Sequence, residues 1–184
     1  MRVKLCGVQS ELTVAIVPAG PGDAVDLARV HVEAWRETYP GILPQAYLDR
    51  MSMAAHARRW RSRLMRSPEI TLVAETPDGL VGYCSGDWSR ALGPPGEAEI
   101  TTLYVLRRAQ RSGLGRRLMT ATARALAARG ATSLVIWVLR DNAGARRFYE
   151  RLGGECDGRR EEPIAGGTVE AVAYRWADIR TLLA

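Results

Sequence analysis

Apolar and polar residues follow two different periods along the chain, and the change between them is clearest in residues 99–154. Residues 100–106 combine β-branched, aromatic and leucine side chains, which is typical of a mostly buried strand. After a polar turn, apolar residues recur every three or four positions and so form one stripe of a helix that Gly130 can end: Leu114, Leu118, Ala121, Ala125 and Ala128. The pattern predicts a strand, a glycine-containing turn and a helix in direct succession.

A second strand and helix follow in the same segment. Residues 133–139 predict another buried strand, and Asp141 and Asn142 precede a short helix that Gly153 and Gly154 end. The apolar positions of this helix are Ala145, Phe148, Tyr149 and Leu152.

The rest of the chain predicts further strands and helices around this segment. Residues 12–17 predict a first strand, Asp23 can cap a helix that ends before Tyr39, and Pro44 can begin a second helix that continues to about Met65. Residues 70–75 and 80–87 predict an antiparallel pair joined by the turn 76–79, and residues 155–160 and 168–176 predict a final hairpin. Residues 91–96 predict a loop. We therefore expect an α/β fold with a mixed, mostly antiparallel central sheet and helices on both faces.

Length and composition favour a single domain. The chain has 184 residues, of which 47% are hydrophobic, which suits one compact core. Residues 1–11 show no period and predict a loose leader before a domain over 12–184. No apolar run approaches the ~20 residues of a membrane-spanning helix, and the N-terminus lacks the pattern of a signal peptide. We expect a soluble cytoplasmic protein without a membrane partner.

Charge and cysteine content argue against several classes of function. The net charge is +6, but Lys4 is the only lysine among 26 basic residues, so the preference for arginine is better explained by codon composition than by selection for nucleic acid. Basic residues do not interleave with aromatic residues in any motif, and we expect no nucleic-acid partner. Cys6, Cys84 and Cys156 stand at unrelated spacings beside only two histidines, so neither a disulfide framework nor a metal site is expected.

The turn between the first predicted strand and helix has the composition of a phosphate-binding loop. It reads Gln110, Arg111, Ser112, Gly113, Leu114, Gly115. At a helix N-terminus the backbone amides lack intrahelical partners and the helix dipole is positive, while glycine lets a phosphate approach the backbone. A tight turn without a ligand is the alternative for this hexapeptide when it is taken alone.

The order of these motifs resembles the GCN5-related N-acetyltransferase (GNAT) superfamily, whose members transfer an acyl group from coenzyme A to an amine. The resemblance covers the strand, the Gln/Arg-x-x-Gly-x-Gly turn, the helix, the second strand, Asn142 and the Phe-Tyr-x-x-x-Gly helix, about a third of the chain. It implies the cofactor acetyl-CoA, held by the backbone of Leu103, Tyr104 and Val105, by residues 110–116 including Arg116, and by Asn142. Asn142 could also act as an N-cap, and the two roles are compatible.

The resemblance also implies catalytic residues. Tyr149 occupies the position that protonates the departing thiolate, although its ring could instead belong only to the core. Glu99 matches the general base of histone-type members, and its even offset from Leu103 places both side chains on one face if no bulge intervenes. Glu33, Glu37 and Asp87 are alternative bases. Trp137 stands where ribosomal-protein N-terminal acetyltransferases carry a glutamate, which argues against that branch.

The acceptor remains open at this stage. In the family the acceptor pocket is formed by the first helices and nearby loops, so Trp35, Tyr39 and Trp88 are candidate walls for a small-molecule amine or a peptide N-terminus. The sequence favours an enzyme over a coenzyme A-binding regulatory module because Asn142 and Tyr149 are both present. It does not decide whether the chain forms a homodimer.

Overall fold

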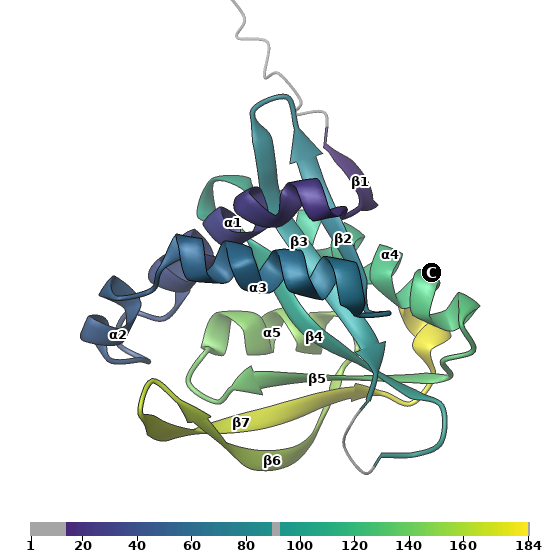
Figure 1. Ribbon diagram of the computed structural model, residues 1–184. Helices are drawn as coiled ribbons and strands as arrows, with labels where there is room; N and C mark the ends of the chain where they lie inside the picture. Colours follow the sequence, from purple (N-terminus) through teal and green to yellow (C-terminus); the bar gives the residue numbers. More distant parts are fainter. Residues whose placement is uncertain (1–13, 90–92, 184) are drawn as a thin grey trace, which may run out of the picture.

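The computed structural model describes residues 14–89 and 93–183, which form one seven-stranded sheet with helices on both faces (Figure 1). The predicted leader and residues 12 and 13 of the predicted first strand lie outside the described residues, as does part of the predicted loop at 91–96. The α/β fold class expected from the sequence is confirmed.

The sheet is antiparallel except for one central pair. Its spatial order is β1-β2-β3-β4-β5-β7-β6, and only β4 and β5 run parallel. The strands are β1 (Ala15–Pro18), β2 (Ile70–Thr76), β3 (Gly79–Trp88), β4 (Glu97–Val105), β5 (Ser133–Leu139), β6 (Glu155–Ile164) and β7 (Gly167–Trp176). The β2–β3 hairpin agrees with the prediction. The β6 strand extends four residues beyond the predicted end at Arg160, so the final hairpin reaches farther along the sheet.

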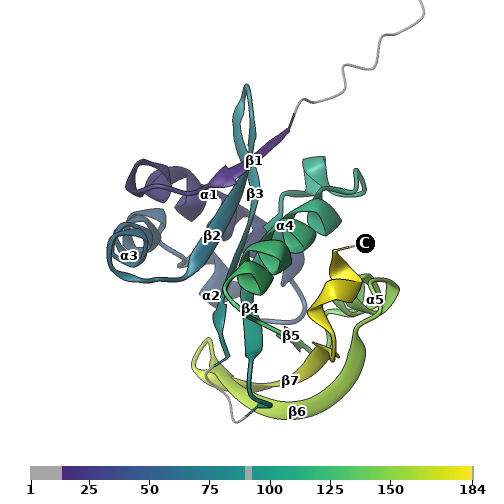
Figure 2. The same cartoon turned by 90° about the vertical axis from the view of Figure 1, so that its right-hand side faces the viewer.

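The α-helices of the described residues lie on both faces of the sheet, three on one face and two on the other (Figure 2). Figure 2 shows α1 (Ala24–Thr38), α2 (Gln45–Asp49) and α3 (Met53–Arg66) on one side of the sheet, with α4 (Leu114–Ala128) and α5 (Ala143–Arg151) on the other. The prediction of a single helix from Pro44 to about Met65 is wrong, because the structure has two helices there, α2 and α3, separated by residues 50–52. Ser52 caps α3 by accepting a hydrogen bond from the Ala55 amide at 3.3 Å. Arg36 donates to the carbonyl oxygens of Leu48, Asp49 and Met51, at and just after the end of α2.

The parallel pair separates halfway along its length. Residues 97–100 of β4 pair with 133–136 of β5, and the pairing ends there. On its other side β4 continues to pair with β3, but Ser85 opposes Thr102 while Gly86 opposes Ile100. Thr101 is therefore the extra residue of a β-bulge, and side chains after it point to the opposite face from the one that strict alternation would give.

His31 lies where α1 packs against β3 and α3. Its Nδ1 and the Tyr83 hydroxyl are 2.6 Å apart, and its ring centroid is 4.6 Å from that of His56. Burial, followed by the positive charges of His56, Arg63 and Arg59, lowers the pKa of His31 to about 3. The folded protein therefore holds His31 neutral.

Acidification is expected to destabilise the fold through His31. In the unfolded chain His31 binds a proton near pH 6.5, whereas in the folded chain it stays neutral down to about pH 3. The contribution of neutral His31 to the free energy of unfolding is therefore fully present above pH 6.5 and is lost as the pH falls toward 3. Each pH unit in this window costs up to about 1.4 kcal/mol. Urea unfolding at pH 7 and pH 5 measures the slope, and His31→Gln is expected to flatten it. An equal slope in His31→Gln and the parent would contradict this assignment.

Candidate active site

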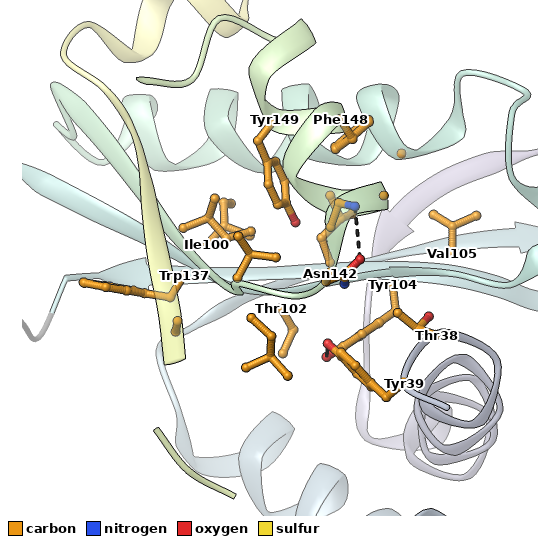
Figure 3. Close-up of a pocket in the computed structure, with 18 of the residues that line it drawn as sticks. Thr38, Tyr39, Ile100, Thr102, Tyr104, Val105, Trp137, Asn142, Phe148 and Tyr149 are labelled. Atoms are coloured by element: carbon orange, nitrogen blue, oxygen red, sulfur yellow. Dashed lines mark hydrogen bonds between the residues drawn. The ribbon is translucent and has the colours of Figure 1, made fainter. Parts of the chain in front are cut away.

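A cavity of about 880 Å³ opens where β4 and β5 separate (Figure 3). It is lined by both strands, by the start of α4, by α5, by the end of α1 and by the β6 strand. Within the described part of the chain, no helix is long and apolar enough to span a membrane, and no cluster of His, Cys, Asp and Glu side chains is placed to hold a metal ion.

The turn into α4 lies at one end of this cavity. Gly113 is the N-cap of α4 with φ +79°, and no side chain caps the helix there. A Cβ added to Gly113 would meet no atom within 4 Å, so the space beside the N-cap is open. Arg111 also has a left-handed backbone, with φ +60°. Five arginines line the cavity near this turn or on α5: Arg107, Arg111, Arg116, Arg147 and Arg151.

Other residues of the predicted phosphate loop support the turn. The Gln110 side chain donates to the Val105 carbonyl at 2.9 Å, and the Ser112 hydroxyl donates to the Ala109 carbonyl at 2.8 Å. Leu114 is buried in the core beneath α4. A Cβ on Gly115 would lie 3.4 Å from the Phe148 ring, so Gly115 also permits α4 and α5 to pack together. The side chains of Ser112 and Leu114 thus support the turn and the core.

Tyr149 and Asn142 enter the cavity from α5. Figure 3 shows the Tyr149 hydroxyl pointing toward the gap between the strands, with its ring buried against Tyr174 and Trp176. Burial raises the pKa of Tyr149 well above its usual value, which keeps the phenol protonated. Asn142 caps α5 by accepting a hydrogen bond from the Ala145 amide at 3.1 Å, and it also lines the cavity.

Glu99 lines the cavity, but its predicted orientation relative to Leu103 is wrong. The bulge at Thr101 reverses the alternation, so Leu103 joins the core beneath α4 while Glu99 lies on the α1 side. The cavity therefore has Glu99 on one face of the strands and Tyr149 on the other. Of the alternative bases, Glu33 binds Arg29 and Arg108, Glu37 accepts from the Arg107 amide at 2.8 Å, and Asp87 is not among the lining residues.

Two of the three predicted acceptor walls lie in the cavity. Trp35 and Tyr39 line it from the end of α1, together with Leu103, Tyr104 and Val105 of β4. Trp88 does not line it and is 46% exposed at the far end of β3, so its prediction as a wall is wrong. The sheet order explains this, because Trp88 pairs with Ala98 at the end where β4 and β5 remain joined.

The β6 strand forms one wall of the cavity that was not predicted from the sequence. Arg160, Glu162 and Ile164 line the cavity, and the Arg160 guanidinium lies 4.1 Å from the Trp137 ring centroid. Their alternation at 160, 162 and 164 marks one face of a strand, but only the position of β7 between β5 and β6 brings that face to the site.

The fold and the site define an α/β protein in which a helix without a side-chain cap begins beside a cavity between two diverging strands. The chain belongs to the acetyltransferase (GNAT) family, whose model matches residues 29–154. It is 31% identical over 161 residues to YuaI, an uncharacterised N-acetyltransferase of Bacillus subtilis (strain 168), covering 87% of this chain and 91% of YuaI.

Solved structures share the fold. The PaiA N-acetyltransferase of Thermoplasma acidophilum, in complex with coenzyme A, superposes with a TM-score of 0.69 at 19% identity, covering 90% of this chain and all of that one (100%). The yncA protein of Salmonella typhimurium, with its cofactor acetyl-CoA, gives a TM-score of 0.67 at 20% identity, covering 90% and 95% of the two chains.

Proposed function

We propose that the protein is an acetyl-CoA-dependent N-acetyltransferase that acetylates a primary amine of a small molecule or a protein N-terminus. The observation that carries the proposal is the uncapped start of α4, which opens on a cavity with Tyr149 and Glu99 on opposite faces of the strands. The complexes of the structural neighbours with coenzyme A and acetyl-CoA support it.

The residues present fit the cofactor. The start of α4, which has no side-chain cap, and the neighbouring arginines suit a pyrophosphate, because a helix N-terminus and guanidinium groups both attract anions. Beyond Ile100 β4 has no strand partner on the β5 side, so backbone groups of this edge, apart from the Val105 carbonyl that accepts from Gln110, can hydrogen-bond the amides of a pantetheine arm. Acetyl-CoA supplies an acetyl group activated as a thioester.

Glu99 is the proposed proton acceptor for the amine. An ammonium must lose a proton before its nitrogen can attack the acetyl carbon, and a carboxylate on the acceptor side of the strands can take that proton directly or through one water. The cavity-lining position of Glu99 on the α1 side meets this requirement.

Tyr149 is the proposed hydrogen-bond donor to the departing sulfur. Attack forms the C–N bond and breaks the C–S bond, which leaves coenzyme A as a thiolate. Because burial raises the pKa of Tyr149, complete proton transfer to the thiolate is unfavourable, and the hydroxyl stabilises the developing negative charge by donation. The proton that Glu99 removes can later reach the thiolate through solvent.

A thiol-release screen tests the proposed function. The protein is mixed with acetyl-CoA and a panel of alkylamines, diamines, arylethylamines, amino-acid amides and short peptides, and free thiol is measured over time. We expect release that depends on at least one amine and saturates with it. Binding of acetyl-CoA without amine-dependent release from any member would favour a coenzyme A-binding regulatory module.

A further inference from the structure

Two tyrosine hydroxyls meet on the α1 side of the cavity. Tyr39 follows α1 and Tyr104 lies on β4, and their hydroxyl oxygens are 3.1 Å apart. Both residues line the cavity. Figure 3 shows the two hydroxyl groups together below the strands, whereas Tyr149 approaches from above them.

The bulge at Thr101 accounts for the direction of Tyr104. Under strict alternation Tyr104 would share the face of Ile100, which belongs to the core beneath α4. Instead it pairs with Tyr83 and packs with that residue under α1. Tyr104 thus places its hydroxyl on the same side of the cavity as Glu99.

Packing fixes the position of both rings. The Tyr39 ring contacts Trp35 edge to face at a centroid distance of 4.9 Å, and Tyr104 contacts His31 edge to face at 5.5 Å. Aromatic contacts of this geometry hold the rings in place. The hydroxyl pair is therefore preorganised at the cavity wall.

The pair stays protonated and is unsuited to act as a base. Burial raises the pKa of Tyr39 and raises that of Tyr104 well above its usual value. One hydroxyl donates its proton to the hydrogen bond within the pair. The pair therefore offers a ligand one remaining O–H donor and several oxygen lone pairs. An amine or ammonium, which brings N–H donors, complements those lone pairs.

We propose that the Tyr39–Tyr104 hydroxyl pair positions the acceptor amine by accepting a hydrogen bond from its N–H. This inference rests on the proposed acetyl transfer in the same cavity. The pair orients the nitrogen, while Glu99 on the same face takes the proton. The tyrosines therefore act in binding and alignment and leave the proton transfer to the carboxylate.

The test uses Tyr39→Phe, Tyr104→Phe and the double variant with the panel amine of highest kcat/KM. Each single variant is expected to raise the KM for that amine about 3–10-fold, the range of one neutral hydrogen bond. In the double variant the KM is expected to rise by less than the product of the two single-variant increases, because the two hydroxyls act as a unit. Affinity for acetyl-CoA and the midpoint of the acid limb of the pH–rate profile should stay unchanged.

Tyr83→Phe is the matched control. Tyr83 belongs to the same aromatic cluster and pairs with Tyr104, but its hydroxyl faces His31 and the residue does not line the cavity. It should lower the melting temperature without changing the KM. Any one of three results would overturn the inference. The KM could be unchanged in both single variants, the acid limb of the pH–rate profile could shift in them, or the KM could rise equally in Tyr83→Phe. A parent protein that acetylates no amine of the panel would instead refute the proposed function.

Discussion

Tyr149→Phe is expected to lower kcat about 10²–10³-fold, the usual loss when one preorganised donor to a developing negative charge is removed. The substitution keeps the ring that packs against Tyr174 and Trp176, so the fold and the affinity for acetyl-CoA should survive. The measurement is kcat at saturating amine, with pre-steady-state kinetics to establish that chemistry limits the rate.

Tyr174→Phe is the control for this prediction. Its ring centroid lies 5.8 Å from that of Tyr149, and its hydroxyl donates to Glu150 at 2.6 Å, away from the residues that line the cavity. Tyr174→Phe should leave kcat within a few-fold of the parent. If Tyr149→Phe were equally active while chemistry limits turnover, Tyr149 would belong to the core alone.

Gly113→Val is expected to weaken acetyl-CoA binding about 10²-fold or more. At φ +79° a side chain with a Cβ costs about 1–2 kcal/mol, and a β-branched residue is worse placed there. The new side chain would also fill the open space beside the α4 N-cap, where a charge-assisted hydrogen bond to phosphate is worth about 1.5–3 kcal/mol. Calorimetry of the folded variant measures the dissociation constant.

Gly130→Val separates backbone strain from loss of the site. Gly130 lies just beyond the other end of α4, has φ +98° and likewise has no atom within 4 Å of an added Cβ. Its substitution should cost comparable stability but leave the affinity for acetyl-CoA unchanged. Equal affinity in Gly113→Val and the parent would show that the turn does not hold the cofactor.

The succession of strand, turn and helix was predictable because its signals are local. Gly113, the buried strand before it and the apolar stripe after it are each determined by residues close together in the chain, and the structure has β4, the αL turn and α4 in those places. Asn142 as a helix cap follows from the same kind of local chemistry.

Features that depend on pairing between distant strands were not predictable. The bulge at Thr101 appears only in the register of β4 against β3, and it reverses the relation between Glu99 and Leu103. The β6 wall of the cavity requires β7 to lie between β5 and β6. No short-range pattern of apolar residues contains this information.

Product stoichiometry with an isotopically labelled acetyl group tests the central claim most directly. The protein is incubated with labelled acetyl-CoA and the best amine of the panel, and mass spectrometry measures the acetylated amine while a thiol reagent measures coenzyme A. We expect one labelled N-acetyl product for each thiol released, and we expect both amounts to fall together in Tyr149→Phe. Thiol release with labelled acetate and no acetylated amine would contradict the central claim.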